Sequence, residues 1–131
     1  MKKSFVLAAL LPLAVAAQDI KQELHAELKA QVEFPATVPA GNYSGITWLG
    51  GNEYAVVCDK ARADGFFIFH INIDPDTGVI SHAYNNEFRS SGYANRDMEG
   101  IAFMPKDTTI FISGEGDNSI KEYELKTGKY T

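Results

Sequence analysis

The segment that decides the fold reads Asn-Arg-Asp-Met-Glu-Gly-Ile-Ala-Phe and covers residues 95–103. Two acids, a base and a glycine stand at the start of an apolar, strand-like stretch. A related segment, Asn-Tyr-Ser-Gly-Ile-Thr-Trp-Leu, covers residues 42–49, so that Ser44 and Glu99 hold equivalent places 55 positions apart. The same offset relates residues 55–58 to residues 110–113. An internal repeat of this length, built from β-type segments alone, predicts the blades of a β-propeller.

Alternating apolar residues and turn signals divide the two units into strands. The predicted fold is all-β, with antiparallel four-stranded blades of a β-propeller that is incomplete. Blade 1 covers about residues 42–95 and blade 2 covers 96–131 without its outer strand, which makes about one and a half blades. Propellers close with about 4–8 blades. We therefore interpret the sequence as the N-terminal piece of a longer protein or a truncated gene model, with a stand-alone small β-domain as the alternative.

The N-terminal residues 1–17 have the pattern of a secretory signal peptide. Lys2 and Lys3 precede an apolar run, from Phe5 to Ala17, that is too short to span a bilayer. The pattern predicts a secreted or periplasmic protein with no membrane span after signal removal. Residues 18–41 are expected to form an N-terminal strand and a linker, because apolar positions alternate over 24–34, although a helical spacing competes there.

Composition and charge exclude several classes of function. The formal net charge is −5 without a basic cluster, which argues against nucleic acid or an anionic membrane as the partner. Cys58 is the single cysteine, and we interpret it as a buried structural thiol.

His25, His70 and His82 are scattered singly, so no zinc pattern is present. Serine-nucleophile and phosphate-loop motifs are also missing.

The acidic residues of the second unit are expected to meet at one rim. In a hairpin, the first strand begins where the second one ends, so Asp97 and Glu99 should lie near Glu115 and Asp117, beside Lys60 of the first unit. Clustered carboxylates repel one another unless a cation or proton intervenes, and oxygen ligands suit Ca²⁺ or Mg²⁺. The four acids thus predict a site for such a cation, with Ca²⁺ as the ion that we expect. The alternative is a structural role, with the acids capping the strand, Arg96 as their ion-pair partner, and an ordinary acidic turn at 115–118.

On several of these stretches the chain resembles the phytase-like family of exported bacterial β-propellers, described as having esterase-like activity. The matching stretches are residues 42–47, 54–60, 88–92, 96–102 and 112–115. The resemblance implies a secreted propeller with a polar site at one end of its central channel, to which Asp97, Glu99 and Glu115 contribute. It also implies a family domain several times longer than this chain.

Two hypotheses about function follow. The first is a metal-assisted hydrolase of phosphate or carboxylic esters, in which Asp97, Glu99 and Glu115 are catalytic and hold Ca²⁺ together with Asp117. In that hypothesis Arg96, Lys60 and Arg89 are the cations that bind a small anionic ester. The alternative is a non-enzymatic β-propeller that binds a ligand or a partner, with structural calcium. In both, the exposed edges and faces of the blades are expected to be covered by missing C-terminal blades or by self-association.

Overall fold

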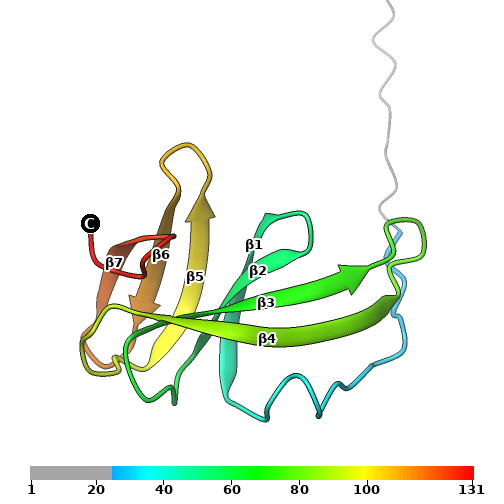
Figure 1. Cartoon of the computed structure of the whole chain (residues 1–131), viewed down its shortest axis with the longest axis horizontal. Helices are drawn as coiled ribbons and strands as arrows, with labels where there is room; N and C mark the ends of the chain where they lie inside the picture. Colours follow the sequence, from blue (N-terminus) through cyan, green and yellow to red (C-terminus); the bar gives the residue numbers. More distant parts are fainter. Residues whose placement is uncertain (1–24) are drawn as a thin grey trace, which may run out of the picture.

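The computed structural model describes residues 25–131, which form two antiparallel sheets (Figure 1). In the first sheet the strands run in the order β1 (Tyr43–Gly50), β2 (Glu53–Cys58), β3 (Gly65–Ile73) and β4 (Ile80–Ser90). The second sheet holds β5 (Met98–Met104), β6 (Thr109–Gly114) and β7 (Ser119–Glu124). The prediction of a four-stranded unit followed by a unit without its outer strand is confirmed. Within residues 25–131 no helix is long and apolar enough to cross a membrane, and the expected signal peptide lies outside the described residues.

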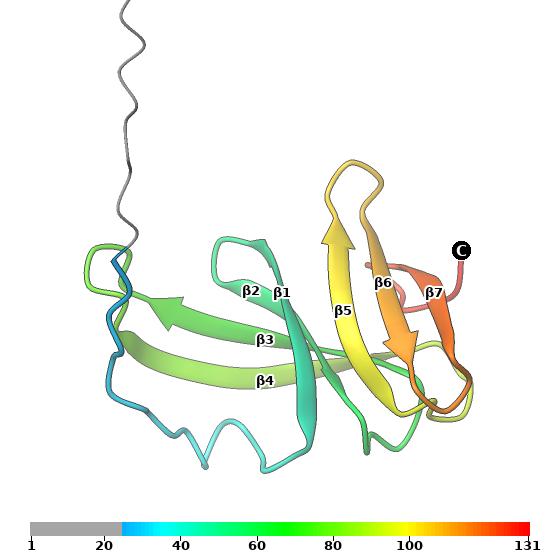
Figure 2. The same cartoon turned by 180° about the vertical axis from the view of Figure 1, so that it is seen from behind.

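The core lies between the two sheets. The first sheet contributes Ala55, Val57, Phe66 and Ile68, all with less than 3% of their surface exposed. Fully buried residues from the second sheet complete it, namely Met98, Ile110, Ile112 and Tyr123. Figure 2 shows β1 and β5 side by side, as expected for the innermost strands of adjacent propeller blades. Since side chains alternate along a strand, each sheet turns one face to this core and the other face away from it.

The strand register differs from the expected repeat by one residue. Ile46 pairs with Val56 in the first sheet, whereas Ile101 pairs with Ile112 in the second. Ile46 and Ile101 are 55 positions apart, but Val56 and Ile112 are 56 positions apart. The expectation of one constant offset is therefore wrong for the second strand. The cause is the turn between β5 and β6, which, counted from equivalent pairs of the two ladders, is one residue longer than the connection between β1 and β2. A shift of one residue along a strand moves every side chain to the opposite face of the sheet.

The N-terminal segment also differs from the prediction. Residues 25–34 carry no strand, so the strand expected over 24–34 is wrong for its described part. A strand needs a neighbouring edge to pair with, and this segment reaches β4 through Thr37. The Thr37 hydroxyl donates to the Ala83 carbonyl at 2.5 Å, and the Asn85 amide donates to the Thr37 carbonyl at 3.1 Å. The segment is held as an irregular strap across the first sheet.

Candidate functional site

The β1–β2 and β5–β6 hairpins bring their open ends to one edge of the molecule, which we call the rim. β1 and β5 begin, and β2 and β6 end, at the lower edge in Figure 1. Hydrogen bonds join the two sheets at this rim, since the Ser44 hydroxyl donates to the Met98 carbonyl at 2.6 Å. Within the second sheet, the Glu115 amide donates to the Asp97 carbonyl at 2.9 Å. The backbone therefore places the predicted acids along a common edge.

Asp97 lies at this rim with a cation from the first sheet. Its Oδ1 is 3.2 Å from the Lys60 ammonium, which also lies 3.4 Å from Asp59. Hydrogen bonds to Asp97 and Asp59 raise the pKa of Lys60 above its ordinary value. Asp97 has a φ of 50°, a left-handed conformation that aspartate tolerates better than most residues. The charge of Asp97 is thus balanced by Lys60 rather than left open for a metal ion.

Asp117 is held by two cations of its own sheet. Lys121 lies 3.0 Å from its Oδ2, and Arg96 lies 2.8 Å from its Oδ1. The hydrogen bond from Lys121, followed by those from Ser119 and Arg96, holds the pKa of the Asp117 carboxyl well below its usual range although partial desolvation opposes this. The acid-rich turn at 115–118 is in this respect a structural turn with its own counter-ions.

Glu99 and Glu115 differ from these two acids. Both side chains are exposed, and neither makes an ion pair within 4.0 Å in the part of the chain that the structure describes. Glu99 occupies an irregularity of the β5–β6 ladder between Met98 and Gly100. Such bulges redirect side chains and occur often next to active sites. Among the described acids of the rim, these two carboxylates are exposed without a counter-ion.

The expected calcium cluster does not form among the described residues. Across residues 25–131 there is no group of three or more His, Cys, Asp or Glu side chains that could hold a metal ion. The physical reason is charge pairing, since Asp97 is drawn to Lys60 while Asp117 is drawn to Arg96 and Lys121. Ca²⁺ takes about six to eight oxygen ligands, and the two remaining glutamates do not supply them. The donor set as it stands does not fit calcium.

Arg96 was expected to bind substrate, and the structure instead places it inside the protein. Its side chain is only 6% exposed, and every nitrogen of the guanidinium is engaged. Nε donates to Asp64 at 3.0 Å, Nη1 to Asp117 at 2.8 Å and Nη2 to the Tyr123 hydroxyl at 2.8 Å. Further bonds reach Ser119 and the Ile112 carbonyl. An arginine satisfied in this way has no donor to offer a ligand.

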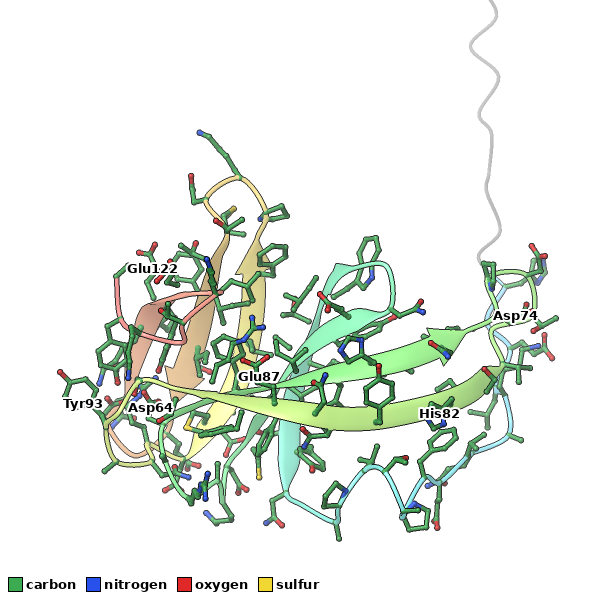
Figure 3. The ribbon with its side chains drawn as sticks, viewed as in Figure 1. Asp64, Asp74, His82, Glu87, Tyr93 and Glu122 are labelled. Carbon is green, nitrogen blue, oxygen red and sulfur yellow. The ribbon has the colours of Figure 1, made fainter. Side chains whose placement is uncertain are left out.

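Asp64 is the partner that the sequence analysis missed. It is fully buried and lies where the ends of the two sheets meet, close to Tyr93 (Figure 3). Its carboxylate accepts hydrogen bonds from Arg96 and from three hydroxyl groups, those of Ser91 at 2.6 Å, Tyr130 at 2.7 Å and Tyr123 at 2.8 Å. Burial alone would raise the pKa of Asp64, but these bonds lower it below the ordinary value. We call these five residues the buried polar network.

Arg89, the third expected substrate cation, is also engaged. Nε and Nη2 each lie 3.0 Å from a carboxylate oxygen of Glu87, and Nη1 donates to the Leu125 carbonyl at 2.8 Å. Arg89 therefore ties β4 to the last turn of the second sheet. Of the three predicted cations, only Lys60 is exposed at the rim, with 63% of its side-chain surface accessible.

A hollow of about 500 Å³ adjoins Lys60 on the first sheet. Arg62 contributes a second cation to its lining, and Asn42 and Asn85 contribute amides. Aromatic and apolar groups complete the lining, among them Tyr43, Phe67, Phe88 and Cys58. Cys58 is buried there, which confirms the expected burial of this thiol. The hollow combines an apolar floor with cationic and amide groups, as ligand sites commonly do.

Similarity to known proteins identifies a family for the chain but does not bear on the geometry of this site. A family model described as phytase-like, with esterase-like activity of phytase, matches residues 38–131. One curated relative is subunit I of eukaryotic translation initiation factor 3 from Neurospora crassa, which is 28% identical over 81 residues. That alignment covers 62% of this chain but only 23% of the relative. No solved structure matches the chain.

Proposed function

Because the chain belongs to the phytase-like family, we propose that it supplies the acidic rim of an exported, esterase-type hydrolase of small anionic esters. The observation that carries this proposal is the exposed carboxylate pair, Glu99 and Glu115, on the same edge as the exposed cation Lys60. Both acids stand on backbone that the β5–β6 hairpin holds in place, which favours a site of fixed geometry.

In the proposed reaction, Glu99 acts as a general base. Its carboxylate accepts a proton from water while the water oxygen attacks the carbonyl carbon or the phosphorus of the ester. The bond to the leaving oxygen breaks, the protonated Glu99 gives its proton to that oxygen, and an alcohol and an acid are released with the Glu99 carboxylate restored. Lys60 balances the negative charge that develops on the attacked group. Asp97 is assigned a positioning role because it contacts the Lys60 ammonium, and Glu115 is assigned as the second carboxylate facing the substrate.

No step of this proposal is assigned to calcium, since the described donor set does not fit the ion. Metal assistance stays a prediction of the sequence pattern, and it would need oxygen ligands beyond those of Glu99 and Glu115. Export likewise rests on the signal-peptide pattern of residues 1–17.

The test is ester turnover by the purified chain with a chromogenic phosphate ester and a chromogenic acetate ester. We expect Glu99→Gln to lower turnover by about 10²-fold or more, as is usual when a general base is lost, and Glu115→Gln to lower it as well. Glu122→Gln is the matched control, because Glu122 is exposed on β7 and away from the rim (Figure 3). Unchanged turnover in both rim variants would contradict the assigned roles.

A second candidate function is non-enzymatic binding of a ligand or partner. It is supported by the pairing of Asp97 and Asp117 with cations, which gives these acids a structural task. The curated relative is itself a subunit of a larger factor. Wild-type protein that binds inorganic phosphate in calorimetry but hydrolyses neither ester would favour this function over the first.

A further inference from the structure

The hollow beside Lys60 is lined by three separate parts of the first sheet and its connections. Residues 39–43 line one side, Lys60 and Arg62 come from the turn after β2, and Phe67 and Phe88 come from β3 and β4. Its volume of about 500 Å³ lies within the range of about 300–1,000 Å³ that is usual for small-molecule sites. No exposed carboxylate of the rim is part of its lining. The hollow is therefore a site distinct from those carboxylates.

Tyr43 holds one side of the hollow in place. Its hydroxyl donates a hydrogen bond to the Pro39 carbonyl at 3.0 Å, which ties the two ends of segment 39–43 together. A Cβ atom at Gly41 would lie 3.0 Å from the Tyr43 ring, so glycine lets the backbone lie close against that ring. The shape of this side does not depend on a ligand, and a site that is already formed loses little conformational freedom on binding.

The hollow offers aromatic rings to a ligand. The Phe67 ring stands edge-on to Tyr43 with centroids 6.0 Å apart, and its centroid lies 4.6 Å from that of Phe88. All three side chains are partly exposed, so part of each ring remains available for contact. Aromatic rings pack favourably on further rings in edge-to-face or offset geometry. A flat, apolar ring therefore fits this part of the hollow.

Arg62 supplies the hollow with a cation that has no counter-ion. Its side chain is exposed, and neither an ion pair nor a hydrogen bond holds it within residues 25–131. Lys60 differs, because Asp59 and Asp97 share its ammonium. No acidic residue of the described chain lines the hollow, although the protein carries a formal net charge of −5. A guanidinium presents a fork of N–H donors that matches the two oxygens of a carboxylate.

The presence of one available cation favours a ligand with one negative charge. A carboxylate carries a single charge, which Arg62 can balance. A phosphate monoester carries about 1.5 to 2 negative charges at pH 7, and the second charge would have to compete with two acids for Lys60. The charges around the hollow therefore favour a carboxylate over a phosphate.

We propose that the hollow binds a small aromatic carboxylate, with Arg62 paired to the carboxylate and Tyr43, Phe67 and Phe88 in contact with the ring. This binding involves no proton transfer and no bond breaking. It goes beyond the proposed hydrolase function and does not depend on it, so Glu99→Gln is expected to leave it unchanged.

The test is an NMR titration of the full chain with benzoate, in which shifts of backbone amide signals report both affinity and location. We expect the shifts to gather in residues 39–43 and 60–62. Arg62→Met should weaken benzoate binding by about tenfold or more, because a charge-assisted hydrogen bond is lost. Lys106→Met is the matched control, since it removes the same charge from the exposed turn between β5 and β6, at the opposite end of the hairpin from the rim (Figure 1).

Three further probes separate the contributions of charge and ring. Acetate keeps the carboxylate without the ring, benzylamine keeps the ring with the opposite charge, and phenyl phosphate carries the larger negative charge. Benzoate is expected to bind more tightly than each of them. Phe88→Leu should weaken the binding of benzoate and leave that of acetate unchanged, and circular dichroism checks that this variant is folded.

Several outcomes would overturn the proposal. The absence of benzoate binding at millimolar concentration is one, and shifts confined to residues outside the lining are another. Equal weakening by Arg62→Met and Lys106→Met would show that the effect of charge is not local. Binding of acetate or benzylamine as tight as that of benzoate would remove the ring or the anion from the argument. Tighter binding of phenyl phosphate would assign the hollow to phosphate groups instead.

Discussion

Arg96 and Asp64 form an ion pair buried between the two sheets, with the arginine Nε 3.0 Å from the aspartate Oδ1. The two residues are 32 positions apart in the chain. Arg96 precedes β5 and Asp64 precedes β3, so the pair joins the first sheet to the second. Residues near the C-terminus close over it, as Tyr130 donates to Asp64 and stacks on Tyr93 with ring centroids 4.9 Å apart.

Breaking this pair from one side should be costly. Arg96→Met leaves the Asp64 carboxylate buried without its cation, and we expect the free energy of unfolding to fall by about 3–5 kcal/mol, measured by urea denaturation. Arg62→Met is the matched control, because Arg62 is exposed and its loss should change stability by about 0.5 kcal/mol or less. Equal effects of the two substitutions would show that the pair contributes nothing specific.

The same network predicts acid sensitivity. The pKa of Asp64 is lower in the folded protein than its ordinary value, which is about 3.9 in an unfolded chain. Its contribution to stability is therefore complete above about pH 5 and is lost as the pH falls through the folded pKa. Urea denaturation at pH 7 and pH 3 should show a smaller pH effect in Asp64→Asn than in wild type. Equal pH effects in the two proteins would count against this linkage.

Gly65 is predicted to be intolerant of any side chain. Its φ is 149°, and a Cβ atom there would lie 2.1 Å from the Arg89 carbonyl oxygen. We expect Gly65→Ala to lower the free energy of unfolding by about 3–5 kcal/mol, from backbone strain and overpacking together. Gly50→Ala isolates the strain, because Gly50 has a φ of 125° but its Cβ would meet nothing within 4 Å. A Gly65→Ala protein as stable as Gly50→Ala would refute the steric argument.

Calcium is predicted to leave the melting temperature of this chain unchanged. An ion that binds only the folded state must raise that temperature with its concentration, and no group of three or more His, Cys, Asp or Glu side chains that could hold a metal occurs within residues 25–131. Thermal melts with and without millimolar Ca²⁺ measure the effect. A rise that disappears in Glu99→Gln would instead support the metal site expected from the acidic pattern.

Local patterns predicted the strands and the common edge of the hairpins well. A nearly continuous apolar run such as that of residues 65–73 marks a strand that is covered on both faces, and the structure has β3 there. Hairpin geometry alone brings Asp97 and Glu115 to one edge, since the second strand returns to where the first began. These features depend on residues that are close together in the chain, so a single sequence is enough to predict them.

Long-range pairing could not be predicted in the same way. The neighbouring acids were expected as partners of Arg96, but the buried partner is Asp64, which looks locally like an ordinary loop residue before Gly65. Nothing in the spacing of the two residues marks them as a pair. The strand expected at 24–34 failed for a related reason, because alternation within a segment does not show whether that segment pairs with the edge of a sheet such as β4.

The extra residue in the turn between β5 and β6 means that the two hairpins are not interchangeable parts. A cassette that replaced this turn with the tighter one after β1 would delete a residue and direct Ile110 and Ile112 into water. Duplication of such a unit must therefore be followed by matched changes in the turn and in the inward-facing residues. An alignment of the two blades that allows no gap at this turn will match residues that face the core in one blade with residues that face away from it in the other.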